Sequence, residues 1–121
     1  METLVDIVNV VCVLMIIALG AVGWFAPRFV MGKLDLETAG SDMGVSEVRA
    51  ASGALFVGLG IGAFLLGEPF GYAMAGFAVL GAAVGRITSI ALDERTTKRT
   101  WGFFGWEIAV GGLLLLLNWP F

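Results

Sequence analysis

Besides Asp6, near the start of the first, four charged side chains fall inside long apolar segments of the sequence, where charges are rare and costly. Two open the second such segment, one lies about two turns before the end of the third, and one lies about two turns into the fourth: Glu47, Arg49, Arg86 and Glu107. At a rise of about 1.5 Å per residue, all four lie at a similar depth, roughly 5–10 Å inside one membrane boundary. An unpaired charge in hydrocarbon costs about 2.5–3.5 kcal/mol, so such groups tend to face inward and pair.

We therefore predict an intramembrane charge layer in which Arg86 pairs with Glu107 or Glu47 and Arg49 completes the set. Ser89, one turn after Arg86, is placed to donate a hydrogen bond to the same network. The layer has two possible uses: it holds three helices in register, or it binds an anionic headgroup, a proton or a solute. Both uses need the same residues, and we favour the structural one.

Small residues recur at a spacing of four in the second and third apolar segments. The two stripes are Ala50, Ala54, Gly58 and Gly62, and Gly81, Gly85 and Ser89. Small side chains let helix backbones approach closely, which is how membrane helices associate without a hydrophobic driving force. We predict that the second and third helices pack through these stripes. Chance spacing is a competing explanation, because the chain has 18 glycines.

The residue types needed for metal, haem or disulfide chemistry are nearly missing. The sequence has no histidine and one cysteine, Cys12, in the middle of the first apolar segment. Histidine is the commonest metal ligand and the usual general base, and one cysteine forms no disulfide within the chain. We therefore expect no cofactor, no metal and no enzymatic activity.

Acidic residues gather at the opposite membrane boundary from the charge layer. Glu2, Asp6 and Glu68 belong to this rim, with Asn9 nearby. Exposed residues of the membrane interface are the ordinary explanation for such a rim. A mouth that gathers cations is the alternative.

Four apolar segments are long enough to position these residues across a membrane. They cover residues 4–25, 47–66, 70–92 and 102–117, and each can cross most or all of about 30 Å of hydrocarbon. Pro27 closes the first segment, Ser46 is a plausible N-cap for the second, and Gly67-Glu68-Pro69 forms a tight turn into the third. The sequence predicts one all-α domain over residues 1–121, an integral membrane four-helix bundle.

The linker between the first two spans is the long one, and its first half mixes bulky apolar with basic residues. Pro27 to Leu34 has the composition of a short helix in the membrane interface, with a plain loop as the alternative. All seven Lys and Arg lie on or near the side that carries this linker and the third connection. The positive-inside rule makes that side cytoplasmic, so both termini are expected on the non-cytoplasmic side.

Composition supports the membrane class. The chain is 59% hydrophobic and 14% charged, with a mean hydropathy of +0.95, whereas soluble domains are about 45–50% apolar and about 25% charged. A formal net charge of −3 argues against nucleic acid as a partner, because phosphate contacts need a basic face. Membrane lipids, other membrane proteins and further copies of the chain are the partners expected.

The order and spacing of several short motifs resemble a family of small bacterial four-helix membrane proteins, classed as a domain of unknown function. The resemblance covers roughly residues 27–117. It rests on Pro27, on Glu47-Val48-Arg49-Ala50 before a glycine-rich helix, on Gly85-Arg86-Ile87-Thr88-Ser89, and on Glu107 before glycines and leucines. It implies a bacterial inner-membrane location and supports the charge layer as a shared feature, but it supplies no activity.

Two functional hypotheses follow, and the first is favoured. The protein is an accessory or assembly subunit of a larger membrane complex, a role that suits its short soluble loops. The alternative is a minimal oligomeric transporter or channel that uses the Glu/Arg layer as a gate or proton relay. A lipid enzyme is the weakest hypothesis, because no histidine or metal-ligand spacing is present.

Overall fold

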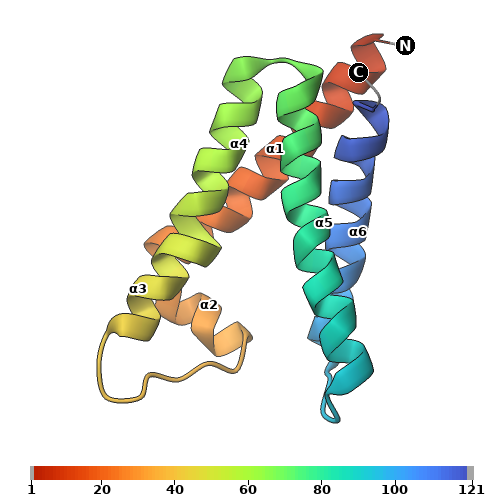
Figure 1. Cartoon of the computed structure of the whole chain (residues 1–121). Helices are drawn as coiled ribbons and strands as arrows, with labels where there is room; N and C mark the ends of the chain where they lie inside the picture. Colours follow the sequence, from red (N-terminus) through yellow and green to blue (C-terminus); the bar gives the residue numbers. More distant parts are fainter. Residues whose placement is uncertain (1, 120–121) are drawn as a thin grey trace. The chain divides into compact units, whose positions relative to one another are not determined.

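The computed structural model describes residues 2–119, and all the regular structure in that range is helical (Figure 1). The elements are α1 (Glu2–Phe25), α2 (Pro27–Lys33), α3 (Met43–Arg49), the π-helical segment η1 (Ala50–Ala54), α4 (Leu55–Leu66), α5 (Pro69–Leu92) and α6 (Lys98–Leu117). Helices α3, η1 and α4 follow one another without a break. The predicted all-α class is confirmed.

Four helical stretches are long and apolar enough to cross a membrane, which makes this a multi-pass membrane protein. They are Thr3–Phe25, Met43–Leu66, Pro69–Leu92 and Lys98–Leu117. The second and the fourth begin earlier than the apolar segments of the sequence do. Asp42 rather than Ser46 is the N-cap of α3, so the prediction for Ser46 was wrong. A capping box between Thr97 and Thr100 lets α6 begin in the polar residues before Trp101.

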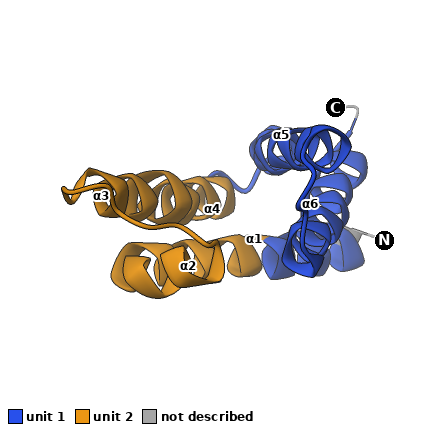
Figure 2. Ribbon diagram, turned by 90° about the horizontal axis from the view of Figure 1, so that it is seen from below, with its two compact units in different colours: residues 1–12, 66–121 blue, residues 13–65 orange. Residues whose placement is uncertain are grey.

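The chain forms two compact units, which are coloured separately in Figure 2. Unit 1 comprises Met1–Cys12 and Leu66–Phe121, and unit 2 comprises Val13–Leu65. Helix α1 contributes its first part to unit 1 and the remainder to unit 2. Each unit is described separately below.

In unit 1, α5 and α6 pack closely along a face of small and branched residues. A Cβ atom added at Gly76 of α5 would lie 2.8 Å from the backbone nitrogen of Leu115 and 3.0 Å from the carbonyl oxygen of Gly111. Val79 of α5 and Leu114 of α6 are almost fully buried at the same face. Glycine at position 76 is therefore what lets the two backbones approach.

In unit 2, α1 approaches η1 and α4 through glycines of its own. A Cβ atom at Gly20 would lie 2.7 Å from the carbonyl oxygen of Gly53, and one at Gly23 would collide with the carbonyl of Ser52. A Cβ atom at Gly53 would lie 2.5 Å from the backbone nitrogen of Trp24. Neither backbone leaves room for a methyl group at this crossing.

Residues 27–33 form the short helix α2, one of the two alternatives that the sequence left open. Met31 is buried with Val45 and Val48 of α3, and Val30 packs against this cluster. The basic residues Arg28 and Lys33 are exposed. Apolar residues on one face and basic residues on the other are what an interfacial helix requires.

The predicted glycine stripes are not the places where helices approach within each unit. A Cβ atom at Gly58, Gly62, Gly81 or Gly85 would meet no atom of its own unit within 4 Å, and Ala50 is exposed with Ala54 half-buried. The α5 face that packs on α6 carries Gly76, Val79 and Ala83 instead. A spacing of four identifies a row of small residues, but it does not say which row faces the neighbouring helix. Packing of the second helix on the third through these stripes stays a prediction.

Candidate functional site

The charged residues of α5 and α6 form a two-point ion pair. Arg86 Nε donates to Glu107 Oε1 at 3.2 Å, and Arg86 Nη2 donates to Oε2 at 2.9 Å. The Glu107 side chain is 8% exposed and that of Arg86 is 33% exposed. The Arg86 guanidinium also lies 5.1 Å from the centre of the Phe103 ring, one turn before Glu107 on α6.

This geometry suits an ion pair that holds α5 and α6 in a fixed register. Both carboxylate oxygens accept from one guanidinium, whose planar fork matches them, and the aromatic face adds a cation–π contact. The pair is one of the two pairings that the sequence predicted. Ser89 is half-buried, and the hydrogen bonds described for the chain include none from its hydroxyl to the pair.

The other two residues of the predicted layer belong to unit 2. Arg49 Nη1 donates to the backbone carbonyl of Trp24 at 3.1 Å. Helix α1 ends at Phe25 before Pro27, and carbonyls in the last turn of a helix lack intrahelical donors. Arg49 supplies one of those donors. Glu47 is exposed on α3.

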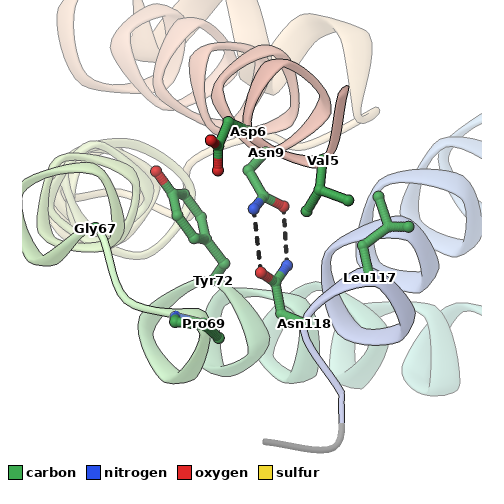
Figure 3. Close-up of a pocket in the computed structure, with 8 residues that line it drawn as sticks. All are labelled: Val5, Asp6, Asn9, Gly67, Pro69, Tyr72, Leu117 and Asn118. Carbon is green, nitrogen blue, oxygen red and sulfur yellow. Dashed lines mark hydrogen bonds between the residues drawn. The ribbon is translucent and has the colours of Figure 1, made fainter. Parts of the chain in front are cut away.

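A second polar cluster, which sequence reasoning missed, joins the start of α1 to the end of α6. Asn118 Nδ2 donates to Asn9 Oδ1 at 2.8 Å, and Asn9 Nδ2 donates back to Asn118 Oδ1 at 3.1 Å (Figure 3). Asn118 Nδ2 also donates to the carbonyl of Leu114 at 2.7 Å. Asn9 is 2% exposed and Asn118 is 6% exposed, so this amide pair is buried. Asn9 and Asn118 are the only two asparagines in the sequence, and they lie near the start of the first apolar segment and directly after the fourth. Their rarity and these positions are the sequence signal from which the pair could have been found.

A pocket of about 370 Å³ lies beside the amide pair. Three structural parts of unit 1 line it: the start of α1, the turn into α5, and the end of α6 (Figure 3). Its lining residues are Val5, Asp6, Asn9, Gly67, Pro69, Tyr72, Leu117 and Asn118. In Figure 3 the Asp6 carboxylate and the Tyr72 hydroxyl lie on the same side of the amide pair.

The pocket takes in part of the predicted acidic rim. Asp6 lines the pocket and Glu68 does not, although both residues are exposed. The side chain of Glu2 lies outside the residues described. Arg86 is 17 positions after Pro69 on α5, so the ion pair and the pocket lie roughly 25 Å apart along that helix.

The amide pair should contribute measurably to stability. Replacing Asn9 with leucine leaves the Asn118 oxygen without its partner, and we expect a loss of about 1 kcal/mol in the free energy of unfolding. Replacing both asparagines with leucine should cost less than the two single losses together. Denaturation in mixed detergent micelles measures all three variants. Additive losses would show that the two amides do not interact.

Residues 4–118 match the model of a family described as "Domain of unknown function (DUF4345)". No curated protein and no solved structure matches the chain.

Proposed function

The chain belongs to the DUF4345 family, a domain of unknown function, and we propose from its own geometry that it is an accessory subunit of a larger membrane assembly. In this role it binds other integral membrane proteins, or further copies of itself, through helix faces that contact lipid in the isolated chain. We place that assembly in the bacterial inner membrane, as the sequence motifs suggested.

The observation that carries the proposal is the two-point pairing of Arg86 with Glu107. A proton relay needs a carboxyl group that can give up its partner, whereas both Glu107 oxygens accept from the same guanidinium. A buried charge whose hydrogen bonds are satisfied by its neighbour fixes the register of two helices. The pairing therefore supports a structural use of the charge layer.

Small-residue stripes offer surfaces for a partner helix. Gly81 and Gly85 of α5 are exposed, and the space above them within unit 1 is open. Rows of this kind let a second membrane helix approach closely. We propose that this stripe, or the one containing Gly58 and Gly62, receives a helix of the partner protein in place of the predicted packing of the second membrane-spanning helix on the third.

The orientation of the chain is part of the proposal. Helix α2 carries Arg28 and Lys33, and Arg95, Lys98 and Arg99 lie in or next to the connection between α5 and α6. By the positive-inside rule we assign both segments to the cytoplasm, with the chain termini on the opposite side. Labelling of single introduced cysteines in intact cells, in a Cys12→Ala background, tests this assignment.

Purification at native abundance tests the accessory role. The tagged chain, extracted in mild detergent, should migrate with defined partners in stoichiometric amounts. The variant Gly81→Leu with Gly85→Leu should lose those partners and keep its helical content. Gly112→Leu is the control, because its position is open in unit 1 and lies outside both stripes. A wild-type chain that migrates alone would contradict the proposal.

The alternative function, a minimal oligomeric transporter or channel, gains support from the polar pocket beside Asn9 and Asn118. Flux in reconstituted vesicles separates the two roles. A transporter that relies on Glu107 should lose flux on Glu107→Gln while it remains folded. An accessory subunit should show no flux of its own.

A further inference from the structure

We propose that the pocket bounded by Asp6, Asn9, Tyr72 and Asn118 binds a primary alkylammonium group. This inference goes beyond the accessory role and does not depend on it, since it rests on a different end of unit 1. Charge, hydrogen bonding and shape of the pocket each contribute to it.

The charge of the pocket comes from one carboxylate. Asp6 is the only charged residue among the eight that line it, and no ion pair is described for its side chain. The basic residues of unit 1 belong to the far end of α5, the connection that follows it and the start of α6. A cation entering the pocket would therefore meet one negative charge, and none of the described residues that line the pocket carries a counter-ion for it.

The polar atoms of the pocket are mainly hydrogen-bond acceptors. Asp6 offers two carboxylate oxygens, and Tyr72 adds a hydroxyl oxygen on the same side of the amide pair (Figure 3). In the amide pair, the Oδ1 atoms of Asn9 and Asn118 each accept one described bond, and a carbonyl oxygen has two lone pairs. An ammonium group carries three N–H donors and no acceptor, which complements this set.

The remaining lining residues select an organic cation over a metal ion. Calcium takes six to eight oxygen ligands, usually several of them carboxylates, and this pocket supplies one acid. Val5, Pro69 and Leu117 provide apolar walls for an alkyl chain. A volume of about 370 Å³ lies in the range of small-ligand pockets and is far larger than a bare ion needs.

The pocket lies at the ends of its helices, near the level of lipid headgroups. Asp6 is in the second turn of α1, Tyr72 is in the first turn of α5, and Asn118 directly follows α6. Two sources of the same chemistry reach that level: the ethanolamine headgroup of a phospholipid and a soluble primary amine.

Calorimetric titration of the purified full-length chain in detergent, with ethylammonium as the probe, tests the proposal. We expect saturable binding that weakens at least about tenfold in Asp6→Asn, the loss expected for a charged hydrogen-bonding partner. Tetramethylammonium, which has no N–H donor, should bind more weakly than ethylammonium. Glu68→Gln removes a nearby acid outside the pocket lining and should leave binding unchanged.

A second variant and a lipid experiment complete the test. Val5→Phe places a bulkier side chain in the pocket wall, keeps Asp6 and should also weaken binding. Native mass spectrometry from bilayers with equal phosphatidylethanolamine and phosphatidylcholine identifies the source: an Asp6-dependent preference for phosphatidylethanolamine indicates the lipid headgroup. Ethylammonium binding without that preference indicates a soluble amine. Absence of both, or equal binding by Asp6→Asn and the wild type, would overturn the proposal.

Discussion

Replacing Arg86 with glutamine is expected to lower the free energy of unfolding by about 3 kcal/mol. The substitution leaves Glu107 buried at 8% exposure without the guanidinium that binds both of its oxygens. Titration with a denaturing detergent, followed by the helical circular dichroism signal, measures the change.

Glu107→Gln and the double variant serve as the matched controls. Glu107→Gln should cost less, because Arg86 is one-third exposed and its long side chain can reach toward the headgroups. The double variant should recover much of the loss in Arg86→Gln, because it leaves no buried charge. A double variant as unstable as the sum of both singles would show that the pair does not couple α5 to α6.

Gly53→Ala is the second substitution with a large expected effect. The added methyl group would lie 2.5 Å from the backbone nitrogen of Trp24 and 2.8 Å from the carbonyl carbon of Gly23. Backbone atoms cannot rotate away as side chains do, so α1 and η1 must separate. We expect a loss of about 3 kcal/mol, the upper range for overpacking.

Gly58→Ala provides the control within the same membrane-spanning stretch. Position 58 is exposed, with open space for a methyl group in unit 2, and alanine is the better helix former by roughly 0.5–1 kcal/mol. This variant should therefore equal or exceed the wild type in thermal stability. Equal losses in Gly53→Ala and Gly58→Ala would contradict the close approach at Gly53, because helix propensity alone predicts a gain at both positions.

The membrane-spanning helices could be predicted because hydropathy alone determines which stretches can cross a bilayer. Their ends were harder to predict, since helix starts depend on local hydrogen bonds that hydropathy does not report. Thr97 and Thr100 begin α6 in a polar stretch, and Asp42 begins α3 before the apolar residues. The π-helical form of Ala50–Ala54 left no signal in the periodicity.

The candidate site was predictable where one rule dominated. A buried charge needs an opposite charge, and that requirement led to Arg86 and Glu107. The same rule placed Arg49 in the charge layer and did not predict its hydrogen bond to the Trp24 carbonyl at the end of α1. Asn9 and Asn118 are 109 positions apart in sequence, and only the packing of α1 with α6 in unit 1 brings them together.

The segment η1 changes how residues along its helix must be counted. A π-type bond closes over one residue more than an α-type bond, so the stretch from Met43 to Leu66 contains extra chain for its number of turns. One residue corresponds to about 100° of rotation about a helix axis. A regular helix of the same sequence would therefore turn Arg49 about a quarter of a revolution relative to Gly60 and Ala63, away from its present alignment with the Trp24 carbonyl. The surplus residue therefore sets how one continuous helix presents both Arg49 and Gly60 to the same neighbour, α1.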